Sequence, residues 1–263
     1  MSIQSPTIES QTSYQKKGFS HSHPIYDQNE IDQVNLAIDE IVKGNYETGI
    51  PPYNEHKKEH LTQELVKIDN TQISNKTIHS FLTKSALGEW VAKATGSKKV
   101  QIWATQLLIK RPSKLDMGGV GWHRDINYWG YWEPNSELFT AWIALSDVKL
   151  ESGPVCMVEG SQTWPDSEGG NFFEQDLEKI KKGFLDSGNT WKEEPMVLSP
   201  GAASLHHKRT IHGSYSNTSN RERRSIAIHL CNENAKIKKM DEINSYVAHL
   251  DDPAHSPVIW DET

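Results

Sequence analysis

The sequence predicts an α+β fold that is mainly β, with N-terminal helices followed by a jelly-roll core of two sheets. The two stretches with the clearest helical spacing of apolar residues both lie before residue 97. From residue 100 to residue 231 the apolar runs are short, strand-like and separated by turn residues. Helices followed by many short strands are typical of a chain built on a β-sandwich or barrel.

Two helices are predicted in the N-terminal part. The first spans residues 27–44, where Asp27 can cap the start and Gly44 suits a left-handed stop. Its apolar face consists of Ile31, Val34, Ile38 and Ile41. The second helix is expected over about 75–96, ending at Gly96.

The predicted strands follow in order along the chain. A short strand is expected at 65–68, between the two helices. The later strands are expected at 100–111, 137–148, 155–161, 202–207 and 224–231. Segment 163–195 is polar and punctuated by glycine, so we expect an insertion or lid there, with a short helix at 172–184.

The 263 residues fit one large domain, and no linker interrupts them. Residues 1–18 are polar and lack an apolar signal core, so we expect a flexible lead-in followed by a single domain over 19–263. No apolar run reaches the length of a membrane span, which excludes a membrane partner. Cys156 and Cys231 lie in apolar runs and predict no disulfide framework, so a cytoplasmic protein is expected.

The net charge of -7 offers no basic face, so no nucleic-acid partner is expected. The basic run RERR at 221–224 fits a solvated strand end. The composition does not indicate an oligomeric state. A small-molecule substrate is the expected partner.

The stretch GWHRDINYWGYW, residues 121–132, places His123 and Asp125 two residues apart among five aromatic rings. In an extended segment these two side chains share a face and can hold one ion. A third ligand is expected from LHHKRTIHGSYSN, whose histidines are His206, His207 and His212. Two histidines and one carboxylate form the facial arrangement of non-haem Fe(II) oxygenases, and the same set also suits Zn or Mn.

Arg223 follows His212 by eleven residues, at the start of a predicted strand. Its planar fork can bind the distal carboxylate of a diacid co-substrate. His206 and His207 are more simply explained by packing or by supporting hydrogen bonds, and His229 as a strand histidine.

The chain resembles the phytanoyl-CoA dioxygenase family of Fe(II)/2-oxoglutarate oxygenases. The matching pieces are WHRD (122–125), AWIALSDV (141–148), SGPVCMVEGS (152–161), IHGSYSN with RERRSIAIHL (211–230) and DDPAHSPVIW (251–260). The combination of His-x-Asp, His-Gly-Ser and the later arginine carries the resemblance.

The resemblance implies a cupin-like double-stranded β-helix that uses Fe(II), 2-oxoglutarate and O2. It assigns His123, Asp125 and His212 as the metal ligands and catalytic residues. The residues that it places around 2-oxoglutarate are Arg223, Ser214, Trp142, Gln106 and Lys67. Gln106 would reach the near carboxylate, although a shift of one residue would turn Leu107 inward instead.

The reaction implied is oxidation of a C–H bond, with 2-oxoglutarate converted to succinate and CO2. Hydroxylation is the main expectation, and some relatives desaturate or cyclise; because Asp125 is present, halogenation is not expected. The aromatic cluster suggests a substrate pocket that contains Asn127, Trp129, Tyr131 and Trp132. A specialised metabolite or an amino-acid derivative would suit it. The alternatives are a catalytically inactive metal-binding barrel, a Zn hydrolase with the same triad and, with less support, a macromolecular demethylase.

Overall fold

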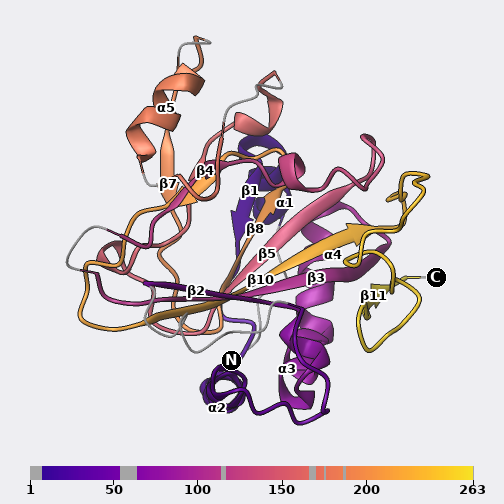
Figure 1. The fold of residues 1–263 in the computed structure, drawn as a ribbon. Helices are drawn as coiled ribbons and strands as arrows, with labels where there is room; N and C mark the ends of the chain where they lie inside the picture. The colour runs from indigo at the N-terminus through magenta and orange to yellow at the C-terminus, as the bar shows by residue number, and fades with distance from the viewer. Residues whose placement is uncertain are drawn as a thin grey trace.

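Two antiparallel sheets form the centre of the fold in the computed structural model, which describes residues 8–53, 64–113, 117–165, 170–174, 176–185 and 188–262. The larger sheet has the order β1 (Phe19–His21), β8 (Ala203–His207), β5 (Leu138–Ala144), β10 (Arg223–Asn232), β3 (Lys99–Lys110) and β11 (Val258–Asp261), and β2 (Leu65–Asp69) also pairs with β3. The smaller sheet has the order β4 (Val120–His123), β9 (His212–Ser214), β6 (Cys156–Val158) and β7 (Glu193–Pro195). Figure 1 shows the long strands β5, β10 and β3 side by side, with α4 (Ser85–Thr95) and α3 (Lys76–Leu82) next to them.

Side chains that alternate along the long strands point to opposite faces of the larger sheet and pack into two separate cores. On β10, Ile226 and Ile228 pack with the helices, whereas Ala227 packs with residues of the smaller sheet such as Met157. Trp142 on β5 belongs to this second core as well. The predicted jelly-roll core with flanking N-terminal helices is therefore confirmed, and the space between the two sheets receives every second side chain of the long strands.

The helices are α1 (Ile8–Lys17), α2 (Gln28–Lys43), α3 (Lys76–Leu82), α4 (Ser85–Thr95) and α5 (Leu177–Leu185), with short 3-10 turns η2 (Thr71–Ile73), η3 (Asp125–Tyr128), η4 (Leu150–Ser152) and η5 (Ser161–Thr163). The prediction for α2 is confirmed: Asp27 and Glu30 form a capping box, and Gly44 ends the helix at φ 85°. No helix among these described elements is long and apolar enough to cross a membrane.

The prediction of one helix over 75–96 is wrong, because α3 and α4 are separate helices. The backbone leaves the helical conformation at Thr83 and becomes extended at Lys84, with φ -61° and ψ 123°. The Lys84 ammonium pairs with Glu30 of α2 at 2.6 Å. The break allows both short helices to bury their apolar sides in the same core.

The N-terminal segment also differs from the expected flexible lead-in. Residues 8–17 form α1, and the partly buried Tyr14 packs against the main core. Ser10 accepts a hydrogen bond from Trp90 Nε1 of α4 at 3.3 Å. Residues 1–7 lie outside the described residues.

Segment 163–195 contains α5, which begins later than the predicted helix. Leu177 and Phe184 of α5 pack in one cluster with Trp122. Residues 166–169, 175 and 186–187 of this segment lie outside the part that the structure describes.

Candidate metal and co-substrate site

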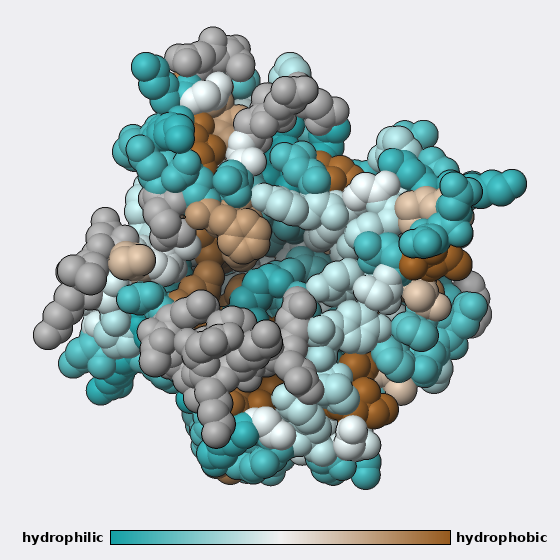
Figure 2. All heavy atoms as spheres, in the orientation of Figure 1, coloured by the Kyte–Doolittle hydropathy of each residue, from teal (hydrophilic) through white to brown (hydrophobic). Residues whose placement is uncertain are grey.

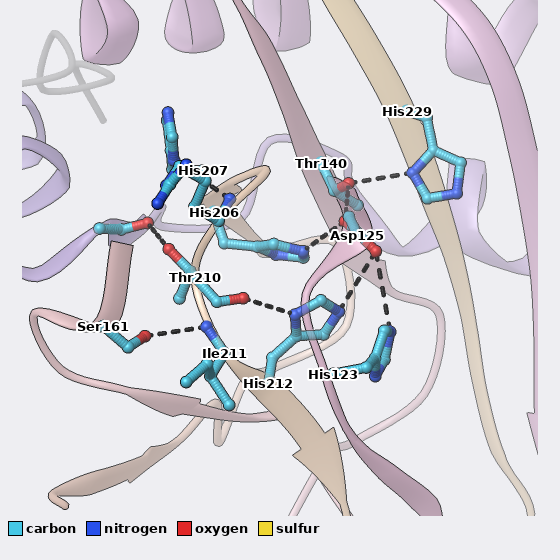
Figure 3. A network of polar contacts seen from close by, with 12 residues as sticks. His123, Asp125, Thr140, Ser161, His206, His207, Thr210, Ile211, His212 and His229 are labelled. Atoms are coloured by element: carbon cyan, nitrogen blue, oxygen red, sulfur yellow. Dashed lines mark hydrogen bonds and ion pairs between the residues drawn. The ribbon is translucent and has the colours of Figure 1, made fainter. Parts of the chain in front are cut away.

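Three predicted ligands meet between the sheets. His123 on β4 lies directly opposite His212 on β9 in the antiparallel register, and Asp125 begins η3 two residues later. Asp125 Oδ1 lies 3.7 Å from His123 Nε2 and 3.6 Å from His212 Nε2. The three side chains are buried, and their ligand atoms lie within 4.8 Å of one another (Figure 3).

Hydrogen bonds from the far side fix both imidazole rings. Nδ1 of His123 lies 2.8 Å from the Gly121 carbonyl, and Nδ1 of His212 lies 3.0 Å from the Thr210 carbonyl. A carbonyl only accepts, so each Nδ1 carries the proton and each Nε2 turns its lone pair toward Asp125. Burial lowers the pKa of His123 and holds that of His212 well below its usual value, so both rings are neutral at pH 7.

The other oxygen of Asp125 is held by the larger sheet. Asp125 Oδ2 accepts from Thr140 Oγ1 at 2.7 Å and from His206 Nε2 at 3.1 Å. Thr140 in turn accepts from His229 Nδ1 at 2.9 Å, since its own proton goes to Asp125. His206, Thr140 and His229 are cross-strand neighbours on β8, β5 and β10 (Figure 3).

The pKa of Asp125 results from opposing effects. Burial alone would raise it, but the surrounding imidazoles and the hydrogen bond from His206 outweigh burial and hold the pKa well below its usual value. A carboxylate that stays ionised beside two neutral imidazoles is the donor set that Fe(II) accepts in oxygenases. The residues present therefore fit the implied metal.

An inner pocket of about 50 Å³ adjoins the three ligands. Its walls include the predicted co-substrate residues Gln106, Trp142, Ser214 and Arg223. The Arg223 guanidinium lies 5.2 Å from the centre of the Trp142 ring and donates to Ser225 Oγ and the Gly153 carbonyl. Burial lowers the pKa of Arg223 to about 10, so the side chain is still cationic at neutral pH.

The register of β3 places Gln106 in this pocket and Leu107 in the helix-side core. Lys67 lies elsewhere, on the wall of a second cavity, where its ammonium pairs with Asp69 at 2.6 Å. Lys67 is therefore the one predicted co-substrate residue that the structure does not bring to the inner pocket.

This outer cavity measures about 260 Å³ and shares His123, Asp125, Gln106, Phe172 and His229 with the inner pocket. The other aromatic residues that line it are Trp103, Tyr128, Trp129, Tyr131, Phe173 and Tyr246. Figure 2 shows apolar side chains around a hollow in this face of the molecule.

Two of the four predicted pocket residues line the outer cavity, and two do not. Trp129 and Tyr131 line the outer cavity. Asn127 is exposed and does not line it, and Trp132 packs in a neighbouring core cluster beside Ile237. Asp125–Tyr128 form the 3-10 turn η3 rather than an extended strand, so the residues that follow Asp125 do not line one face of a strand.

Phe172, from segment 163–195, contributes a wall that the sequence did not reveal. Its ring lies 5.1 Å from that of His123, and its backbone N–H donates to Tyr128 Oη at 2.9 Å. Thr140 was also missed, although it stands two residues before Trp142 on β5 and therefore on the same face. His206 was expected to be a supporting residue, and its hydrogen bond to Asp125 agrees with that expectation.

A known protein family matches most of the chain. The family model described as phytanoyl-CoA dioxygenase (PhyH) matches residues 14–225. The chain is 23% identical over 233 residues to a probable alpha-ketoglutarate-dependent hypophosphite dioxygenase of Stutzerimonas stutzeri, covering 84% of this chain and 77% of the relative.

Two solved structures share the fold. The alpha-ketoglutarate-dependent carbocyclase SnoK from nogalamycin biosynthesis has a TM-score of 0.71 at 17% identity and covers 90% of each chain. EctD from S. alaskensis, solved with 2-oxoglutarate and 5-hydroxyectoine, has a TM-score of 0.70 at 14% identity and covers 94% of this chain and 85% of EctD. The chain belongs to the phytanoyl-CoA dioxygenase family, and the predicted enzyme class, an oxygenase dependent on Fe(II) and 2-oxoglutarate, is confirmed.

Proposed function

We propose that the protein hydroxylates a C–H bond of a small organic molecule that binds in the outer cavity. The observation that carries this proposal is the shared wall between the two cavities. His123 and Asp125 border both, so a molecule in the outer cavity lies beside the ligand set without entering the inner pocket.

His123, Asp125 and His212 would hold Fe(II), and Arg223 with Ser214 would bind the distal carboxylate of 2-oxoglutarate. The chemistry supplied by the bound iron and 2-oxoglutarate is activation of dioxygen, with succinate and CO2 as co-products. Gln106 lines the same pocket as the three ligands and would bind the near carboxylate. These residues orient the co-substrate, because a bidentate arginine fork selects a carboxylate at a fixed distance from the metal.

The cavity walls favour a substrate with an apolar body and a polar end. Trp129, Tyr131 and Phe172 offer ring faces, which pack on apolar surface and exclude water from the reacting carbon. Polar groups of Lys67, Asn244 and Tyr246 stand elsewhere on the wall. A specialised metabolite or an amino-acid derivative has this combination of surfaces. The family assignment favours an active oxygenase over the inactive barrel and the Zn hydrolase.

The hypophosphite dioxygenase among the relatives suggests a second candidate substrate. Hypophosphite is a small, fully polar anion that can use none of the aromatic wall. The one cation that lines the outer cavity within the described part of the chain is Lys67, and Asp69 already neutralises it. The cavity therefore supports an organic substrate better.

A turnover screen tests the proposal. The protein is incubated with Fe(II), 2-oxoglutarate, O2 and ascorbate, together with panels of aromatic amino acids, alkaloid-like and terpenoid compounds and, separately, hypophosphite. We expect succinate formation coupled to a product that has gained one oxygen atom, and no coupled product with Asp125→Ala. Coupled oxidation of hypophosphite alone would overturn the assignment to organic substrates.

A further inference from the structure

Two buried basic side chains, Lys110 and Arg223, stand directly opposite each other, and Arg223 lines the inner pocket. Lys110 ends β3, Arg223 begins β10, and the register pairs them. Lys110 is 0% exposed and Arg223 is 2% exposed. Like charges at directly opposite positions of an antiparallel pair are destabilising, and burial increases their repulsion.

Neutral groups surround both basic side chains. Lys110 Nζ donates to Ser214 Oγ at 2.6 Å and to the Tyr215 carbonyl at 2.5 Å. Arg223 donates to Ser225 Oγ at 2.7 Å and to the Gly153 carbonyl at 3.3 Å. Among the residues that the structure describes, no carboxylate forms an ion pair with either side chain. Burial first, and then the Arg223 guanidinium, hold the pKa of Lys110 well below its usual value.

A turn at Gly153 contacts both basic side chains. Gly153 has φ +66°, and its carbonyl accepts from Arg223. A Cβ added at Gly153 would lie 2.4 Å from the Tyr215 carbonyl oxygen and 3.0 Å from Lys110 Cδ. The turn therefore needs glycine both for its conformation and for the close passage of the lysine.

The pair favours a bound anion. A carboxylate beside Arg223 would offset the effect of the guanidinium on Lys110 and favour the protonated ammonium, because a nearby negative charge raises the pKa of a lysine. Ser214 lines the inner pocket, and its oxygen already accepts from Lys110. The Ser214 hydroxyl proton is consequently free to donate to a ligand in the pocket.

We infer that Lys110 is a positioning residue for the distal carboxylate of 2-oxoglutarate, acting through the Ser214 hydroxyl and through its charge beside Arg223. This inference rests on the proposed use of the inner pocket for the co-substrate. Arg223 alone would supply one positive charge; with Lys110 the pocket discriminates more strongly between 2-oxo acids that carry a second carboxylate and those that do not.

Anaerobic binding measurements test this role. The Fe(II)-loaded protein is titrated with 2-oxoglutarate, and the visible charge-transfer band gives Kd for the wild type and for Lys110→Met. The same titration with pyruvate uses a 2-oxo acid without a distal carboxylate. Lys43→Met, an exposed lysine beside Glu40, is a control with the same change in side chain and net charge.

We expect Lys110→Met to weaken 2-oxoglutarate binding by about tenfold or more, equivalent to about 1.4 kcal/mol per tenfold. The Kd for pyruvate and the affinity for Fe(II) without co-substrate should stay within about twofold of wild type, and Lys43→Met should change nothing. In the Ser214→Ala background the effect of Lys110→Met should shrink, since part of it passes through that hydroxyl.

An unchanged Kd for 2-oxoglutarate in Lys110→Met, or an equal loss for 2-oxoglutarate and pyruvate, overturns the inference. If Lys110→Met does not fold, Lys110→Gln, which keeps a donor but removes the charge, decides by the same comparison. A wild-type protein that binds Fe(II) but gives no band with 2-oxoglutarate would refute the proposed function itself, which separates the two failures.

Discussion

Replacement of Thr140 by valine removes one hydroxyl from the support of Asp125 while keeping the shape of the side chain. Thr140 Oγ1 is one of two donors to Asp125 Oδ2, at 2.7 Å, and is the shorter of the two contacts. The same oxygen accepts from His229 Nδ1 at 2.9 Å, so the valine leaves that ring nitrogen without its acceptor. Both losses fall on buried side chains.

The expected magnitude follows from these contacts. A hydrogen bond to a charged acceptor contributes roughly 1.5–3 kcal/mol, so the metal-free variant should lose about that much unfolding free energy. Removal of a group that supports a metal ligand commonly weakens metal binding about 10- to 100-fold. We expect Thr140→Val to fall in this range for Fe(II), because Asp125 Oδ1 is then held less rigidly toward the two imidazoles.

Chelator competition under anaerobic conditions measures the Fe(II) affinity, and urea unfolding of the metal-free protein measures the stability. Thr140→Ser is the matched control, since it retains the hydroxyl and should bind Fe(II) within about threefold of wild type. Equal Fe(II) affinity in the valine variant and the wild type would refute the reasoning. So would a serine variant as weak as the valine variant.

Three further substitutions test the substrate cavity and the fold. Trp129→Ala removes an aromatic wall of the outer cavity and should raise KM for the substrate about tenfold or more while leaving 2-oxoglutarate binding unchanged; an unchanged KM would exclude Trp129 from the substrate pocket. Tyr128→Phe removes the acceptor of the Phe172 N–H and should raise KM without lowering the melting temperature, because the bond lies at the surface. Steady-state kinetics and a thermal melt measure the two effects. A lowered melting temperature with an unchanged KM would show that Tyr128 has only a structural role. Gly88→Ala places a Cβ 2.1 Å from the Ile259 carbonyl oxygen and should destabilise the protein by about 1–3 kcal/mol in urea unfolding. Gly183→Ala, which meets nothing within 4 Å, is its control and should not destabilise.

The sequence predicted the long strands well, and it singled out three side chains that the structure brings together, because both depend on local pattern. Five strands of three or four residues, β1, β4, β7, β9 and β11, were not predicted, since so few residues carry little periodicity. His123 and Asp125 come from one short stretch, and His212 and Arg223 are linked by a fixed spacing. The period of two along β5 and β10 was readable for the same reason, and it places Trp142 and Arg223 on the inner face.

The features that were missed depend on contacts between distant elements. Lys110 ends a strand in a Lys-Arg pair, which in a sequence resembles a solvated strand end. Only the pairing of β3 with β10 shows that this lysine is buried opposite Arg223. Lys67 lies on the wall of the outer cavity rather than the inner pocket, where it pairs with Asp69 two residues away, and its role toward the co-substrate stays a prediction.

The break between α3 and α4 was likewise hidden in a continuous apolar pattern. Thr83 and Lys84 carry no glycine or proline signal, and the chain bends there so that both helices reach one core. Asn127 and Trp132 were assigned to the pocket because they follow Asp125 closely, but Asn127 in η3 is exposed and Trp132 packs in a core cluster.

The measurement that tests the central claim most directly is an anaerobic titration of the purified wild-type protein with Fe(II) in the presence of excess 2-oxoglutarate, followed by visible absorption. The claim that His123, Asp125 and His212 hold one iron and that Arg223 binds the co-substrate predicts a charge-transfer band that saturates at one Fe(II) per chain. It also predicts that the band is lost in Asp125→Ala and needs far more 2-oxoglutarate in Arg223→Met. Iron bound at one equivalent without any band, or a band unaffected by both substitutions, would contradict it.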